Sequence, residues 1–189
     1  MQENKNKNEK VNEYERAPGF RPRLAIYHAN PRGTGCAISM ELHPAHDELD
    51  GSICCTFASQ RTVGNRMGKT PTFPTFDWDD PIRVMLFFED LSKMMQVFRG
   101  ECESIDRDQG IFHRTAKGIT RIQLRHIIDP VSGYSFEATF TPAGGGEGVR
   151  AVFLMTPAEA LGICEAIGGC MYLVAFGVPR VLAPRELKA

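Results

Sequence analysis

The sequence contains no block of charge of one sign and none of the common catalytic motifs. Its 22 lysines and arginines and 23 aspartates and glutamates leave a formal net charge of −1. This balance lacks the overall basic signature of many proteins that bind nucleic acid or anionic membranes. A nucleophile elbow, a phosphate-binding glycine loop and an H-E-x-x-H sequence are also missing. We therefore expect no enzyme and no cofactor.

The cysteines show no disulfide or metal pattern, and no long uninterrupted apolar run is present. The six cysteines include no C-x-x-C pair, and no apolar signal segment precedes them. Cys36, Cys55 and Cys164 occupy positions where a core residue is expected, so we interpret the cysteines as reduced thiols in a cytoplasmic protein. The apolar run at 162–178 contains Glu165 and several glycines, which argues against a membrane span.

The composition predicts one folded domain between two tails. Hydrophobic residues make up 42% of the 189 residues, enough for a sizeable core. Residues 1–20 carry four bases and four acids with little apolar content, which indicates a disordered leader. We expect a single domain at 21–180, with repeats at 23–105 and 109–178, followed by a C-terminal tail at 181–189.

Hydrophobic residues alternate with a period of two in the first half of the chain, as in strands of a sheet covered on one side. The expected strands are 23–29, 36–43, 52–60 and 81–88, and the residues at 30–33 have turn chemistry. Residues 61–80 are rich in Gly, Pro and Thr and are expected to form an extended loop. Apolar residues at helical spacing then predict a helix from Glu89. The first unit is therefore β-β-β-β-α.

The second half repeats this order. Strands are expected at 110–115, 120–128, 134–140 and 149–155, and Thr156 and Glu159 form a capping box that opens a helix at Pro157. Residues 26–35, "IYHANPRGTG", match residues 111–120, "IFHRTAKGIT", at an offset of 85. The fourth strands align at an offset of 67, with Arg83 and Arg150 in register. The difference of 18 residues falls in the long loop, so an internal duplication is expected.

Two tandem β-β-β-β-α units in one domain resemble the Whirly fold, shared by the Whirly single-stranded DNA-binding family and the trypanosomatid guide-RNA-binding proteins. Pur-family domains and the single-stranded DNA-binding domain of the general transcriptional positive cofactor are also similar. The resemblance covers roughly residues 23–178 and rests on element order and on the repeat. It implies an α+β fold of two antiparallel sheets and two helices, and binding of single-stranded DNA or RNA by a homo-oligomer. The lysine-glycine-lysine-alanine stretch of plant Whirly proteins is absent, so no binding residue is carried over from it.

Single-strand binders use cations that contact phosphates and aromatic rings on which bases stack. The densest cluster of such residues lies in the second hairpin, and the first hairpin and the long loop supply others. The candidate nucleic-acid-binding residues are Tyr27, Arg32, Arg66, Lys69, Trp78, Phe112, Arg114, Lys117, Arg121 and Arg125.

Structural alternatives exist for several of these residues. Arg121 and Arg125 could form a solvated sheet face paired with acids such as Glu137, and the aromatic residues of the long loop could pin that loop to the core. A protein-interaction or scaffold module without nucleic-acid binding is the corresponding functional alternative. A second, weaker alternative is an enzyme or metal site at His43, His46 and Asp47, whose spacing matches no known site; we expect no metal.

The fourth strands, 82–88 and 149–155, are apolar on both faces. A strand in a sheet with one wet face should alternate, so something must cover the second face. Since one helix covers only one side, we expect a homo-oligomer, a dimer or a tetramer, with an interface near these strands.

Overall fold

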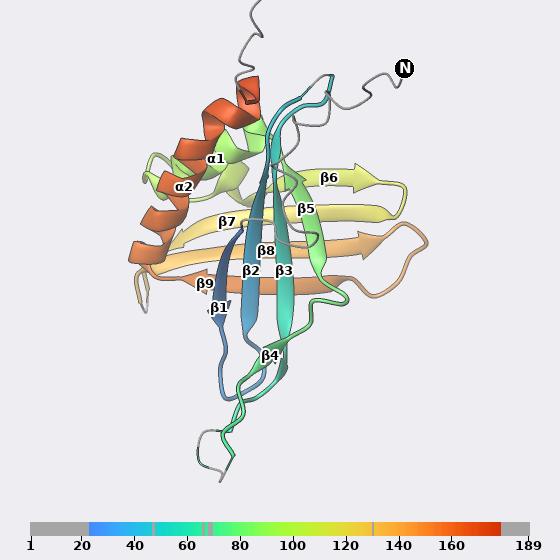
Figure 1. Cartoon of the computed structure of the whole chain (residues 1–189), viewed down its shortest axis with the longest axis vertical. Coiled ribbons are helices and arrows are strands. Elements are labelled where there is room, and N and C mark those ends of the chain that lie inside the picture. The colour runs from blue at the N-terminus through green and yellow to red at the C-terminus, as the bar shows by residue number, and fades with distance from the viewer. Residues whose placement is uncertain (1–22, 47, 66, 68–69, 130, 179–189) are drawn as a thin grey trace, which may run out of the picture.

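A five-stranded and a four-stranded antiparallel sheet, each followed by a helix, form the core of the computed structural model (Figure 1). The structure describes residues 23–178 except 47, 66, 68–69 and 130. The α+β class and the two β-β-β-β-α repeats predicted from the sequence are confirmed. The expected leader and C-terminal tail lie outside the described residues, as do Asp47, Arg66 and Lys69.

The first sheet has the order β1-β2-β3-β5, and a short strand, β4, also pairs with β3. Its strands are β1 (Leu24–His28), β2 (Cys36–His43), β3 (Ser52–Thr62), β4 (Thr75–Phe76) and β5 (Ile82–Leu86). Helix α1 (Phe88–Phe98) follows. The second sheet has the order β6-β7-β8-β9, with β6 (Ile111–Thr115), β7 (Gly118–Ile127), β8 (Gly133–Pro142) and β9 (Val149–Met155). Helix α2 (Pro157–Phe176) closes the repeat with the predicted capping box and proline at its start.

The two sheets cross face to face, and the core lies between them (Figure 1). Phe57 of the first sheet and Phe136 of the second meet in an edge-to-face contact, with ring centroids 4.8 Å apart. Ile38, Ile122 and Phe153 are also fully buried in this layer. Because the inner faces meet, the outer faces of the two sheets point in opposite directions.

Helix α2 packs against α1 and against strands of both sheets. It buries Ala160, Ile163, Cys164, Ile167 and Val174. The remaining surface of the helix is unusually apolar: Leu161 is 63% exposed and Phe176 is 75% exposed. By length and composition alone this helix could span a membrane, although part of it belongs to the core.

Two local expectations need correction. The segment at 61–80 is not wholly a loop, because β3 continues to Thr62 and β4 pairs with it around a bulge. β5 and β9 do alternate in burial: one face enters the core, and the other carries exposed apolar side chains such as Met85 and Leu154. Nothing among the described residues covers these side chains fully. All six cysteines are free, and Cys36, Cys55 and Cys164 are buried as expected.

The repeated histidines join the two repeats reciprocally. His28 of β1 donates from Nε2 to Oε1 of Glu159 at the start of α2 (2.7 Å), and its Nδ1 lies 2.7 Å from the carbonyl oxygen of Leu154. His113 of β6 lies 3.1 Å from the Asp90 carboxylate at the start of α1, an ion-pair distance without hydrogen-bond geometry. Each first strand thus contacts the capping carboxylate of the other repeat's helix, which gives the sequence repeat a structural explanation.

Candidate nucleic-acid interface

The outer face of the second sheet carries four arginines and one exposed aromatic ring, and we call it the arginine face. Alternation along the strands directs Ile111, Ile122, Ala138 and Ala151 into the core. Their neighbours therefore point to the other side of the sheet. The arginine face consists of Phe112 and Arg114 on β6, Arg121 and Arg125 on β7, and Arg150 on β9.

The strand register brings most of these residues into one row across the sheet. Phe112 pairs with Arg121, Arg121 pairs with Thr139 of β8, and Thr139 pairs with Arg150. The Arg121 guanidinium carbon lies 5.9 Å from the centroid of the Phe112 ring, which is 61% exposed. An aromatic ring and two cations therefore lie in one row across four neighbouring strands, which are spaced about 4.8 Å apart.

The arginines already have protein partners. Arg150 Nη2 donates to Glu137 Oε2 at 2.6 Å, and this bond lowers the pKa of Glu137, against the opposing effect of burial. Arg121 Nε donates to the carbonyl of Gln109 at 2.8 Å and its Nη2 donates to the carbonyl of Asp108. Acidic partners were expected for Arg121 and Arg125 on the adjacent strand. Instead, Asp108, which precedes β6, contacts both arginines: its carbonyl accepts from Arg121 and its carboxylate pairs with Arg125. Glu137 on the adjacent strand forms its ion pair with Arg150.

The candidate residues of the first repeat lie on the other sheet. Arg32 is exposed at the turn between β1 and β2, the position that Lys117 occupies between β6 and β7. Tyr27 is on the outer face of the first sheet, where its ring contacts Phe76 (5.6 Å between centroids) and Trp78 (6.2 Å). The fold therefore separates Tyr27, Arg32 and Trp78 from the arginine face instead of gathering all candidates on one surface.

Trp78 is held by its neighbours. Besides the edge contact with Tyr27, its ring lies 5.9 Å below the guanidinium carbon of Arg23. Phe76 and Trp78 are half-buried, and β4 ties the segment to β3. These contacts agree with the interpretation that Phe76 and Trp78 pin the segment to the first sheet. Phe73, included in the same interpretation, is 77% exposed and does not, and the Tyr27 ring is half exposed.

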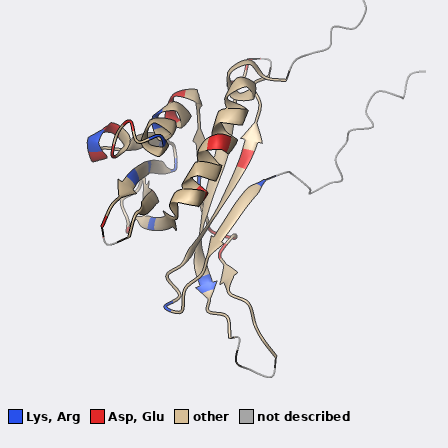
Figure 2. Ribbon diagram, turned by 90° about the vertical axis from the view of Figure 1, so that its left-hand side faces the viewer, with Lys and Arg blue, Asp and Glu red and all other residues tan. Residues whose placement is uncertain are grey.

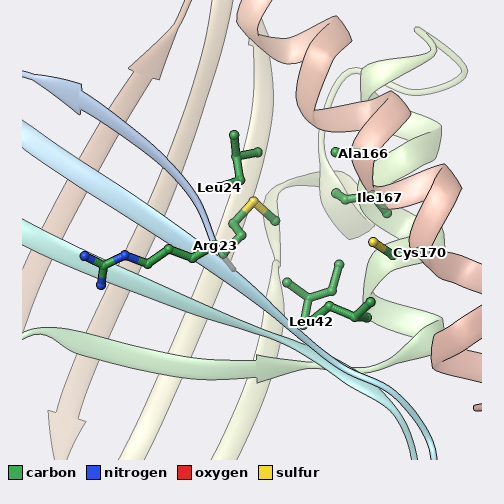
Figure 3. Close-up of a pocket in the computed structure, with 8 residues that line it drawn as sticks. Arg23, Leu24, Leu42, Ala166, Ile167 and Cys170 are labelled. Atoms are coloured by element: carbon green, nitrogen blue, oxygen red, sulfur yellow. The ribbon is translucent and has the colours of Figure 1, made fainter. Parts of the chain in front are cut away.

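An apolar cleft of about 390 Å³ lies between the first sheet and α2 (Figure 3). Leu24, Met40, Leu42, Ile53, Ala166, Ile167 and Cys170 line it, together with Arg23. The side chain of Arg23 runs away from the cleft (Figure 3), and its guanidinium carbon lies over the Trp78 ring. No charged group is therefore directed into this space from the lining residues, and the cleft lacks the chemistry of an active site.

The turn with His43 and His46 shows no metal geometry among its described residues. Nε2 of His43 lies 3.6 Å from the Glu41 carboxylate. Within the described part of the chain, no three His, Cys, Asp or Glu side chains come close enough to hold a metal ion. Asp47, the third residue of this alternative, is outside the described residues.

Two residues of the arginine face region were not among the sequence candidates. Arg150 was noticed only as the partner of Arg83 in the repeat, and pairing of β9 with β8 is what places it beside Thr139. Asp108 had no sequence signal, since its role depends on the three-dimensional path of residues 105–110. Charged residues of both signs are interspersed over the ribbon, in keeping with the near-zero net charge (Figure 2).

The architecture defines a Whirly-like fold, and comparison with solved structures agrees. The chain superposes on WHY3 from Arabidopsis thaliana with a TM-score of 0.65 and 17% identity, covering 84% of this chain and 90% of that one. WHY1 from Arabidopsis thaliana gives a TM-score of 0.63 and 17% identity, with 82% and 91% covered. A guide-RNA-binding protein complex bound to a gRNA gives 0.55 and 14%, with 85% and 97% covered. No family model and no curated protein matches the sequence.

Proposed function

We propose that this protein binds single-stranded DNA or RNA through the arginine face, without enzymatic activity. The observation that carries the proposal is the row of Phe112, Arg121, Thr139 and Arg150 across the second sheet. Exposed guanidinium groups contact phosphates, and an exposed ring next to them stacks on a base. Arg114 and Lys117 extend the basic surface toward the β6–β7 turn.

The structural neighbours support this choice over other ligands. One of them is described as a guide-RNA-binding protein complex bound to a gRNA. At 14% identity the likeness concerns the fold, so the proposal for this chain depends on its own arginines and on Phe112. The arginine face extends across four neighbouring strands of one sheet, an arrangement that suits an extended strand better than a small molecule, which usually binds in a concave pocket.

We also propose that the protein acts as a homo-oligomer. Apolar side chains remain exposed on β5, β9 and α2, including Met85, Leu154, Leu161, Tyr172 and Phe176. Exposed apolar surface of this kind is typical of interfaces. A second copy that covers α2 alone would leave the arginine face open, because the residues of that face lie on β6, β7 and β9 and not on the helix.

A protein-interaction module is the second candidate, and the ion pairs favour it. Glu137 and Asp108 neutralise part of the positive charge of the arginine face. In that case the exposed apolar surface of α2 would bind another protein, and the arginine face would have no ligand.

Fluorescence anisotropy with labelled mixed-sequence single strands and a matched duplex tests the proposal. We expect binding to single strands that weakens as salt increases, and weaker binding to the duplex. Absence of single-strand binding at physiological salt would reject nucleic-acid binding and leave the interaction module.

A further inference from the structure

Residues 105–110 form a bulge in the edge of the second sheet, on the side of the arginine face. Before the bulge, Ser104 bridges Arg125; after it, Ile111 pairs with Ile122. Residues 105–110 therefore lie opposite only positions 123 and 124 of β7, and the chain has to leave the plane of the sheet. Asp108 lies on the outer side of the sheet, because the side chains that contact it, Arg121, Gln123 and Arg125, belong to the outer face.

The bulge contacts two of the four arginines of the arginine face, Arg121 and Arg125. Arg121 donates to the carbonyls of Asp108 and Gln109. The Asp108 carboxylate accepts a hydrogen bond from Gln123 Nε2 at 2.9 Å and lies 3.5 Å from Nη2 of Arg125. Gln123 is only 3% exposed although it belongs to the outer face, because the bulge covers it. A carboxylate and two carbonyls thus occupy positions that phosphate oxygens would need.

The bulge has an unfavourable backbone conformation. Asp106, Arg107 and Asp108 have φ values of 46°, 52° and 70°, in the left-handed region that residues with a Cβ rarely adopt. Consecutive residues of this kind persist only when surrounding contacts hold them. Here the contacts are the arginines, the hydrogen bond from the Asp108 amide to Ser104 Oγ, and an ion pair of 3.1 Å between Lys93 and Asp106.

The covered side of the bulge also contains an unsatisfied acceptor. Oε1 of Gln123 is buried and has no hydrogen-bond partner within the described part of the chain. A buried acceptor without a partner disfavours the conformation that buries it. Backbone strain and this acceptor both oppose the closed position of the bulge, whereas the contacts with Arg121 and Arg125 favour it. The segment therefore has the properties of an element that another ligand of these arginines can displace.

We propose that residues 105–110 are an autoinhibitory flap, in which Asp108 competes with nucleic-acid phosphates for Arg121 and Arg125 and is displaced when a single strand binds. This regulation rests on the proposed function of the arginine face. It requires Asp108 to weaken binding. A carboxylate that merely positioned the arginines for phosphate would strengthen binding instead.

The test compares Asp108→Asn with Asp79→Asn, using a labelled mixed-sequence 30-nucleotide single strand. Asp79 forms an ion pair of 3.2 Å with Arg61, and this pair does not involve the second sheet. The Asp79→Asn variant therefore makes the same charge change and also removes an ion pair with an arginine. Since an exposed ion pair contributes little, we expect Asp108→Asn to bind roughly two- to fivefold more tightly than the parent. Because Arg125 contacts the strand in both complexes once the flap is displaced, the slope of log K against log salt should stay close to that of the parent. Asp79→Asn should match the parent protein.

Hydrogen exchange of the flap provides a readout that does not depend on affinity. The Gln109 amide donates to the Asp106 carbonyl at 3.1 Å and the Gly110 amide donates to the Ile105 carbonyl at 3.3 Å. Both amides should exchange faster in free Asp108→Asn than in the free parent, and faster in the parent when the 30-nucleotide strand is added.

The outcomes separate the two proposals. If the parent and both variants bind the strand equally, or if Asp108→Asn binds more weakly, the flap is wrong and the arginine face remains the binding surface. If the Gln109 and Gly110 amides exchange at the same rate in free Asp108→Asn as in the free parent, the proposal of a flap is also wrong. If neither the parent nor Asp108→Asn binds single strands, the proposed function fails and the flap fails with it. Binding by Asp108→Asn alone would support both.

Discussion

Removal of two charges from the arginine face gives the sharpest prediction of nucleic-acid binding. The side chains of Arg125 and Arg150 are about half exposed or more, and among the described residues they form no hydrogen bond with a backbone group, so both can be replaced with little effect on the sheet. Glutamine is the suitable replacement because its amide can still donate to Glu137. Four residues along the strand and two strands across place the two α-carbons about 16 Å apart, so they would contact different phosphates.

The magnitude follows from counterion release. Each phosphate contact with a single strand contributes about 0.7 to the slope of log K against log salt, so the double variant should lose about 1.4. Relative to 1 M salt, this corresponds to about fivefold per contact at 0.1 M, and about 25-fold for both. The loss should be similar for all sequences, because phosphates carry no base information.

Anisotropy titrations measure the affinity and the salt slope. They run from 0.05 to 0.4 M salt, about an eightfold range, which is wide enough to resolve a slope change of this size. Arg83→Gln with Arg99→Gln is the matched control, since it removes two exposed positive charges at β5 and at the end of α1. The control should keep the slope of the parent. If Arg125→Gln with Arg150→Gln keeps the parent's affinity and slope while its urea midpoint is unchanged, the arginine face is not the binding surface. Equal losses in both double variants would indicate a general charge effect.

Three further results are expected. Phe112→Ala should weaken single-strand binding by about 1 to 3 kcal/mol with an unchanged salt slope, because stacking releases no counterions; a changed slope would contradict stacking. Glu137→Gln should lower the free energy of unfolding at pH 7 by up to about 1 kcal/mol. The hydrogen bond from Arg150 lowers the pKa of Glu137 in the folded protein, so this stabilisation is present at neutral pH and is lost as the pH falls below the ordinary glutamate range and through that lowered pKa. Urea midpoints of parent and variant should therefore differ at neutral pH and converge in acid; an equal difference under both conditions would refute the pairing with Arg150. Leu161→Arg with Phe176→Arg should convert the parent's dimer or tetramer to monomer in light scattering, because both residues are exposed on α2; a parent that is already monomeric at micromolar concentration would refute the oligomer.

Much of the fold could be predicted from local patterns. Alternation identified the long strands, since a strand with one buried face needs apolar residues at every second position. The capping box and proline before α2 marked the start of that helix to the residue. The internal repeat identified the overall architecture, because two copies of one β-β-β-β-α unit restrict how the sheets can be arranged. The short strand β4 was missed: two residues carry no periodicity, and pairing with β3 alone defines them.

The candidate site was only partly predictable. Alternation along β7 put Arg121 and Arg125 on one face, and the same rule predicted Gln123 beside them. It could not predict that the bulge before β6 covers Gln123, because that depends on chain path and not on local preference. The separation of Tyr27 and Trp78 from Phe112 was also beyond the sequence, since it follows from the crossing of the two sheets.

By itself, the sequence determined the elements, their order and the face of each strand that turns inward, because these depend on residues close together in the chain. Tertiary structure decided which side chains from different strands become neighbours. Register places Arg150 in the same row as Arg121, and the crossed sheets direct their outer faces apart. The reciprocal contacts of His28 with Glu159 and of His113 with Asp90 span 131 and 23 residues, respectively. Such contacts form only when both sheets are packed, because no local interaction can bring those partners together.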